Sequence, residues 1–113
     1  MSPKGTVLVV DDDPIVLETT RLRLARAGWD VETRDQALGT AQWIVERRPD
    51  VVLLDVGMPG VSGDVIAEVL RRNGLVNNVA IILHSGLSLD ELVELQASTG
   101  AAGAIQKTGN DAL

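Results

Sequence analysis

The residues best suited to chemistry are acidic, and three of them stand side by side. The apolar run Val7–Val10 leads directly into Asp11, Asp12 and Asp13, and a second apolar run ends at Asp55. Converging carboxylates raise one another's pKa unless a cation lies among them. A hard divalent ion such as Mg²⁺ accepts one or two carboxylates, a carbonyl and several waters. A bound metal would therefore explain why a strand ends in such a cluster.

A hydroxyl and an amine complete a set of groups for phosphoryl transfer. Ser85 follows an apolar run that ends at Leu83, and Lys107 follows the last apolar segment. One carboxylate can attack phosphorus while the metal, the amine and the hydroxyl stabilise the equatorial oxygens. Taken singly, these residues have ordinary structural interpretations; Asp13, for example, can simply cap a helix. His84 adjoins Ser85, but adjacent strand residues point to opposite faces, which favours a structural role for His84.

Five strands are predicted to position these groups. Three apolar runs are continuous rather than alternating, as is typical of parallel strands covered on both faces. The predicted strands are Thr6–Val10, Trp29–Arg34, Val51–Leu54 with Asp55 at its end, Val79–Leu83, and a short strand in "GAAGAIQK" before Lys107.

Segments of helical period lie between the strands. Capping residues, prolines and glycines mark their ends. The first predicted helix begins at Asp13-Pro14 and ends at Gly28, and the second begins with Asp35 as its cap and ends at Pro49. The third runs over about Gly63–Asn73, with Ile66, Val69 and Leu70 buried. The fourth runs from a capping box at Ser88–Glu91 to about Ser98.

The alternation of strand and helix predicts an α/β fold, a doubly wound open parallel sheet with helices on both faces. Right-handed crossovers bring the loops that follow the strands to one edge of the sheet. Ligands bind at this edge, near the point where the strand order reverses. The acidic run, Asp55, Ser85 and Lys107 all follow strands, so we expect them to meet there.

Length and composition narrow the class of protein. The chain has 113 residues, which predicts one domain over residues 1–113, and 45% of them are hydrophobic. Its net charge of −6, with scattered cations, argues against direct binding of nucleic acid. It has no cysteine, no signal-peptide pattern and no run of membrane-spanning length, so a cytoplasmic location without membrane contact is predicted.

Four motifs together resemble the receiver domain of bacterial two-component response regulators, in the CheY-like superfamily. They are, in order, "VLVVDDDP", "PDVVLLDVGMPGVSG", "IILHSG" and "GAAGAIQK". The match extends from about Lys4 to Lys107, and the run from Asp55 through Pro59-Gly60 to Gly63 is highly specific. The resemblance implies a five-stranded sheet in the order 2-1-3-4-5.

The resemblance also implies a role for each site residue. Asp55 would accept the phosphoryl group from a phosphohistidine of a sensor histidine kinase or a histidine phosphotransfer protein. Asp12 and Asp55 would bind Mg²⁺ or Mn²⁺ directly, Asp11 through a water, and Gly57 through its backbone carbonyl. Ser85 would be the switch hydroxyl and Lys107 the cation paired with the phosphoryl group. Such a domain would be a signalling domain and not an enzyme: it would catalyse only its own phosphorylation and dephosphorylation, and it would signal to a downstream effector domain or protein.

Three departures from the family pattern bear on how the domain would pass on its signal. Thr108 stands where proline usually follows the lysine, and Ala104 stands where an aromatic ring usually changes rotamer. The fifth helix is predicted to be absent or reduced to a stub after about residue 107, because "TGNDAL" is short and holds poor helix formers. Part of the sheet face that carries Val7, Val9 and Ile105 would then be exposed, which predicts that it is covered by self-association, by a partner or by a further segment of a longer chain.

Two other functions fit part of the pattern. A haloacid-dehalogenase-like phosphatase would use Asp11 as its nucleophile, but this reading leaves "LLDVGMPG" unexplained, and the chain lacks the cap and a downstream acidic motif. A pseudo-receiver would keep the fold and act as an interaction module without phosphorylation. The intact Asp11, Asp12, Asp55, Ser85 and Lys107 count against it, whereas Ala104 and Thr108 leave it open.

Overall fold

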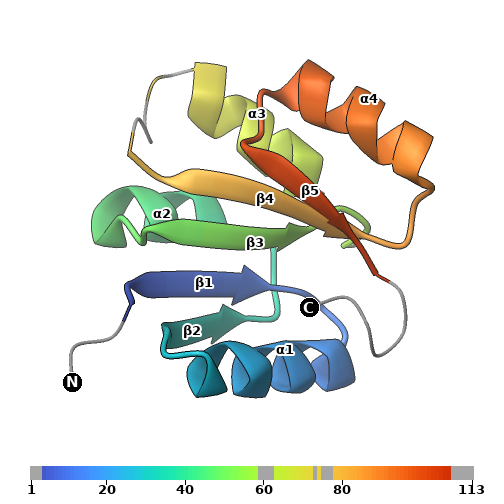
Figure 1. The fold of residues 1–113 in the computed structure, drawn as a ribbon. Helices are drawn as coiled ribbons and strands as arrows, with labels where there is room; N and C mark the ends of the chain where they lie inside the picture. The colour runs from blue at the N-terminus through green and yellow to red at the C-terminus, as the bar shows by residue number, and fades with distance from the viewer. Residues whose placement is uncertain (1–3, 59–62, 73, 75–77, 108–113) are drawn as a thin grey trace.

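The chain forms a five-stranded parallel sheet in the order β2-β1-β3-β4-β5 (Figure 1). The computed structural model describes residues 4–58, 63–72, 74 and 78–107. The strands are β1 (Thr6–Val10), β2 (Asp30–Arg34), β3 (Val51–Asp55), β4 (Ala80–Ser85) and β5 (Gly103–Gln106). The predicted fold class and strand order are therefore confirmed.

Four helices connect the strands of the described chain: α1 (Pro14–Arg26), α2 (Thr40–Arg47), α3 (Gly63–Arg72) and α4 (Leu89–Thr99). Two of their starts follow the predicted capping chemistry. The Asp13 carboxylate accepts hydrogen bonds from the backbone of Ile15 and Val16 at the start of α1. Ser88 and Glu91 form a reciprocal capping box at the start of α4. Capping therefore fixes where α1 begins after β1 and where α4 begins after β4.

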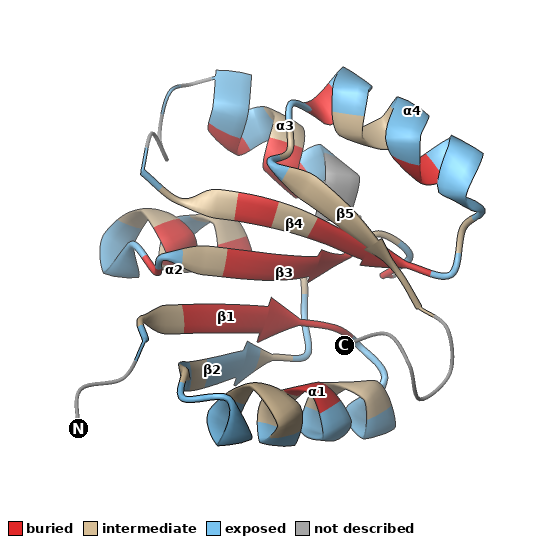
Figure 2. Ribbon diagram, viewed as in Figure 1, coloured by how far each residue is buried: buried red, intermediate tan, exposed pale blue. Residues whose placement is uncertain are grey.

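The central strands are buried and the edge strands are not (Figure 2). Residues 7–10 of β1 and 52–55 of β3 are buried, whereas β2 and β5 contain no buried residue. Continuous apolar runs suit strands that have helices on both faces, which is why the runs in β1 and β3 predicted their positions correctly.

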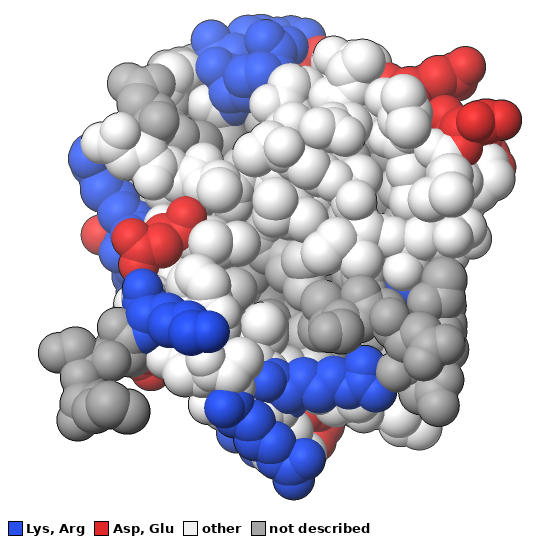
Figure 3. Space-filling model, in the orientation of Figure 1, with Lys and Arg blue, Asp and Glu red and all other residues white. Residues whose placement is uncertain are grey.

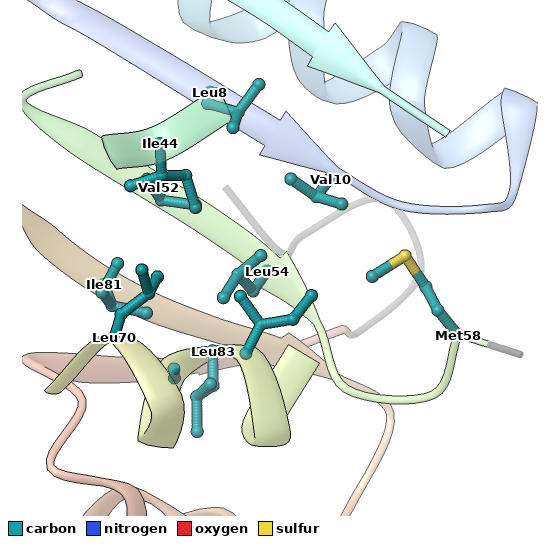
Figure 4. Close-up of a cluster of buried hydrophobic side chains, with 11 residues drawn as sticks. Leu8, Val10, Ile44, Val52, Leu54, Met58, Leu70, Ile81 and Leu83 are labelled. Atoms are coloured by element: carbon teal, nitrogen blue, oxygen red, sulfur yellow. The ribbon is translucent and has the colours of Figure 1, made fainter. Parts of the chain in front are cut away.

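The main hydrophobic cluster lies between the sheet and the helices α2 and α3 (Figure 4). Leu8, Leu54 and Leu83 from the strands meet Ile44 of α2 and Leu70 of α3 there. Because side chains alternate along a strand, the residues between them point to the opposite face. There α1 packs against β1 and β2. The two covered faces leave the carboxyl edge of the sheet free to carry polar groups.

The start of α2 differs from the prediction. Asp35 does not cap it: the helix begins at Thr40, and its N-cap is Gly39, with φ of 80° and no side-chain hydrogen bond. Arg34 holds the preceding loop out of the helix, since its guanidinium donates to Leu38 O at 2.8 Å and to Thr40 Oγ1 at 3.0 Å. A long-range contact therefore outweighs the local capping signal.

Two further details correct the sequence-based boundaries. In α3, Ile66 and Leu70 are buried as predicted, but Val69 is 43% exposed, and Ala67 takes the buried position between them. The small alanine allows α3 to approach the sheet closely. β4 continues two residues beyond the predicted Leu83, to Ser85, because β5 pairs with it through His84 and Ser85.

The prediction of an exposed sheet face is wrong for two of its three residues. Val7 and Val9 are 3% and 1% exposed. They lie on the face of the sheet where α1 packs. Ile105 of β5 is half-buried. The predicted stub of a fifth helix and Thr108 lie outside the described residues, as do Pro59 and Gly60 of the central motif.

Candidate functional site

The candidate site lies where the strand order reverses, between β1 and β3. Val10 of β1 is in register with Leu54 of β3, so Asp11 and Asp55 follow on neighbouring strands. Asp55 is in register with His84 of β4, and Ser85 with Gln106 of β5. The strand ends therefore bring the acidic run, Asp55, Ser85 and Lys107 to one edge, at the point where doubly wound sheets bind ligands.

The three consecutive aspartates have three different environments. Asp11 is 1% exposed, and its Oδ1 accepts a hydrogen bond of 2.9 Å from the backbone of Asp13. Asp12 is exposed. Asp13 points away to cap α1, where its Oδ1 accepts from Ile15 N at 2.9 Å. Asp11 and Asp12 are thus the two members of the run available to the site.

Lys107 bridges the two buried carboxylates. Its Nζ lies 2.8 Å from Asp11 Oδ2 and 3.3 Å from Asp55 Oδ1. Burial acts to lower the pKa of Lys107, but the hydrogen bond and the charge of Asp11, with those of Asp55, outweigh it and raise the pKa above its ordinary value. The ammonium therefore stays charged between Asp11 and Asp55.

Asp12 is repelled by the other carboxylates of the cluster. Desolvation raises the pKa of the Asp12 carboxyl, and the hydrogen bond and the charge of Asp55 raise it further. One carboxylate oxygen from each of Asp11, Asp12 and Asp55 can be chosen so that all three lie within 4.8 Å of one another. Three hard oxygen ligands at this spacing, with excess negative charge, fit a divalent cation such as Mg²⁺.

Gly57 borders the carboxylate of Asp55. Its backbone N–H donates to Asp55 Oδ1 at 3.0 Å. A Cβ atom at residue 57 would lie 3.8 Å from the same oxygen, which is ordinary van der Waals contact. A side chain would therefore fit at this position and would stand beside the carboxylate. The absence of one leaves Asp55 open on that side.

Ser85 is buried, and its hydroxyl oxygen accepts a hydrogen bond of 3.1 Å from the backbone N–H of Leu87. The backbone of Lys107 donates to Ser85 O at 2.6 Å, which ties the end of β4 to the end of β5. Gln106, which the sequence analysis did not single out, donates from Nε2 to Leu87 O at 3.0 Å. A polar residue beside Lys107 in an otherwise apolar strand was the only sequence signal for it.

His84 lies in register with Asp55, and its Nε2 has no hydrogen-bond partner in the described part of the chain. It is 2% exposed. Burial lowers the pKa of His84, and the charge of Lys107 lowers it further, whereas Asp11 and Asp55 act in the opposite direction. The imidazole is therefore neutral at pH 7, in keeping with the structural role predicted for it.

Comparison with known proteins identifies the family. A model of the response regulator receiver domain matches residues 7–113. The chain belongs to this family and is a receiver domain of the kind found in two-component response regulators. The comparisons do not favour the phosphatase alternative or the pseudo-receiver alternative. Among the described residues, no helix has the length and apolar character needed to cross a membrane.

Individual relatives agree with the family assignment. The chain is 35% identical over 78 residues to the phosphate regulon transcriptional regulatory protein PhoB of Pseudomonas aeruginosa, covering 69% of this chain and 34% of that protein. It is 31% identical over 97 residues to the transcriptional regulatory protein CseB of Streptomyces avermitilis, covering 86% of this chain and 41% of that protein. The chain thus spans well under half the length of these relatives.

A solved structure supports the same family assignment. The BeF3-activated N-terminal receiver domain of Klebsiella pneumoniae RstA superposes with a TM-score of 0.82 at 29% identity, covering 95% of this chain and 89% of that one.

Proposed function

We propose that this receiver domain accepts a phosphoryl group on Asp55, in the cytoplasm, in a reaction that requires Mg²⁺ or Mn²⁺. The donor is a phosphohistidine on a sensor histidine kinase or a histidine phosphotransfer protein, and the output passes to an effector domain or protein. The observation that carries the proposal is the placement of Lys107 Nζ 3.3 Å from Asp55 Oδ1, beside the carboxylates of Asp11 and Asp12.

The chemistry follows from what each side chain offers. A carboxylate oxygen of Asp55 attacks phosphorus, a P–O bond forms, and the P–N bond to the donor imidazole breaks. Lys107 supplies positive charge to the phosphoryl oxygens, and the Ser85 hydroxyl donates a hydrogen bond to one of them. The signal ends when water attacks the same phosphorus, the P–O bond to Asp55 breaks, and inorganic phosphate leaves. The domain thus catalyses only its own phosphorylation and dephosphorylation.

Metal binding would use the acidic cluster. Asp12 and Asp55 would be direct ligands with the backbone carbonyl of Gly57, and Asp11 would act through a water. The indirect role of Asp11 is supported by its existing partners, Asp13 N–H and Lys107 Nζ, which engage both of its carboxylate oxygens. When bound, a divalent cation would offset the negative charge that the cluster and the phosphoryl group bring together.

The partners of Asp11 argue against the phosphatase alternative. Both of its carboxylate oxygens are engaged, Oδ1 by the backbone N–H of Asp13 and Oδ2 by Lys107 Nζ, which leaves neither oxygen available as a nucleophile. Asp55 is held on one oxygen, Oδ1, by Gly57 N–H and Lys107. Phosphate release from simple phosphomonoesters would distinguish the two functions, because a receiver should release essentially none.

The proposed partners are proteins. The net charge of −6 supports a domain that does not itself bind nucleic acid. On the face in Figure 3, Lys and Arg side chains lie in separate groups around the margin and do not form one continuous patch. Self-association through the sheet face that carries Val7, Val9 and Ile105 remains a prediction, although Val7 and Val9 themselves are buried and could not form the contact.

The direct experiment is treatment with acetyl phosphate, followed by mass measurement of the intact chain. We expect a gain of one phosphoryl group with Mg²⁺ and none when the metal is removed by a chelator. The absence of any mass gain with Mg²⁺ would favour the pseudo-receiver alternative.

A further inference from the structure

The backbone of Leu87 is held from two directions at the start of the loop between β4 and α4. Its N–H donates to Ser85 Oγ at 3.1 Å, and its carbonyl accepts from Gln106 Nε2 at 3.0 Å. Gln106 is in register with Ser85 on the neighbouring strand, so both restraints come from adjacent residues of the sheet. Ser85, Leu87 and Gln106 thus form one hydrogen-bonded unit beside the candidate site.

Leu87 also lies immediately before the N-cap of α4. Ser88 accepts from Glu91 N at 3.2 Å, and the Glu91 carboxylate lies 2.9 Å from Ser88 Oγ. The capping box joins the end of the loop firmly to the helix. A displacement of the Leu87 backbone should therefore also move the start of α4.

Gln106 is the side chain of β5 that reaches this loop. Ala104 lies on the same face of β5, two residues earlier, and packs against the hydrophobic cluster. Its methyl group offers no hydrogen bond. Among the described residues of β5, only Gln106 donates a side-chain hydrogen bond to the loop between β4 and α4.

We propose that Gln106 is a positioning residue that holds Leu87, and through it the Ser85 hydroxyl, in the unphosphorylated arrangement. The proposal rests on the proposed function, in which Ser85 donates to a phosphoryl oxygen on Asp55. In the described chain Ser85 Oγ has Leu87 N as its partner and makes no hydrogen bond to Asp55. Moving the hydroxyl toward Asp55 either breaks the bond to Leu87 N or pulls Leu87 away from Gln106.

The hydrogen bond from Gln106 therefore opposes phosphorylation. A contact that stabilises only one of two states shifts the equilibrium toward that state by its own free energy. Removing it should make the phosphorylated arrangement easier to reach, while the binding of the metal alone, which does not involve Ser85, stays the same.

The test uses Gln106→Met, which keeps the length of the side chain and removes its amide. The matched control is Gln96→Met, because Gln96 Nε2 likewise donates to a backbone carbonyl, that of Ala102, at 3.3 Å, but does not touch Leu87. The probe is beryllofluoride, an analogue of the phosphoryl group, titrated at a fixed, saturating concentration of Mg²⁺. Mg²⁺ alone is titrated in parallel.

We expect Gln106→Met to bind beryllofluoride about 2- to 10-fold more tightly than wild type, the factor that one net hydrogen bond supplies. Its Mg²⁺ affinity should be unchanged, as should both affinities of Gln96→Met. In wild type, the amide resonances of Leu87 and Ser88 should shift when beryllofluoride binds.

Equal or weaker beryllofluoride binding by Gln106→Met would overturn the role of Gln106, as would unshifted resonances of Leu87 and Ser88. The failure of the proposed function looks different: in that case wild type itself would bind no beryllofluoride in the presence of Mg²⁺.

Discussion

Replacing Lys107 by methionine would remove the cation between two buried carboxylates while keeping most of the aliphatic chain. Lys107 Nζ lies 2.8 Å from Asp11 Oδ2 and 3.3 Å from Asp55 Oδ1. Removing one member of a buried ion pair costs about 3–5 kcal/mol, because the other charge is left unpaired. The Lys107 side chain is 24% exposed, so water should offset part of this loss.

Proton uptake sets an upper limit to the cost. An aspartate with an ordinary pKa of about 3.9 takes up a proton at pH 7 for about 4 kcal/mol, since each pH unit corresponds to about 1.36 kcal/mol. If the carboxylates of Asp11 and Asp55 cannot both remain charged without Lys107, one of them would take up a proton. We therefore expect Lys107→Met to lower the free energy of unfolding by about 2–4 kcal/mol at pH 7 without Mg²⁺.

The pH dependence has a definite sign. At pH 5 the same proton costs only about 1.5 kcal/mol, so the deficit of the variant should shrink to that value or less. The charge of Lys107 itself does not change between pH 5 and 7, because its pKa is raised above its ordinary value, so this pH dependence comes from the carboxylates. At alkaline pH the stabilising contribution of Lys107 should be lost as the pH rises through its raised pKa.

Urea unfolding at pH 5 and pH 7, with and without Mg²⁺, measures these differences. Added Mg²⁺ should stabilise Lys107→Met more than wild type, since the metal brings positive charge to the same carboxylates. A variant as stable as wild type at pH 7 without metal, or a deficit that grows as the pH falls, would refute this electrostatic reasoning.

Three other substitutions test separate parts of the molecule. Asp12→Ala should weaken Mg²⁺ binding and slow labelling by acetyl phosphate. Without metal it should be more stable than wild type in urea at pH 7, because the raised pKa of Asp12 marks its charged form as disfavoured; this gain should vanish at acid pH. Gly57→Met should lengthen the lifetime of the aspartyl phosphate, measured by loss of the added mass, and an unchanged rate would show that residue 57 does not control access. Leu70→Ala, at a fully buried site, should cost about 2–5 kcal/mol in urea unfolding, and a cost near zero would contradict the packing of α3.

The sheet and the gathering of the site residues could be predicted because they depend on local patterns. Continuous apolar runs identified β1 and β3, and each run ended at the aspartates that now lie side by side. A parallel sheet places such ends on one edge whatever the details of packing. The identities of the acidic, hydroxyl and amine groups then defined the candidate chemistry.

Features that depend on long-range contacts could not be predicted in the same way. Arg34 delays the start of α2 by bonding to Leu38 and Thr40, and no capping rule contains this information. The bond from Gln106 to Leu87 joins residues 19 positions apart, so only the folded sheet brings them together. The burial of Ala67 in place of Val69 depends on how closely α3 approaches the strands.

The identity of the phosphorylated residue is the central claim and can be measured directly. Wild type, Asp55→Asn and Asp13→Asn would each be treated with acetyl phosphate and Mg²⁺, and the modified peptide identified by mass. Asp13→Asn is the matched control, because it removes a carboxylate from the adjacent acidic run while asparagine can still cap α1. We predict one phosphoryl group on the peptide containing Asp55 in wild type and in Asp13→Asn, and none in Asp55→Asn. Full labelling of Asp55→Asn, or labelling confined to another peptide in wild type, would contradict the account.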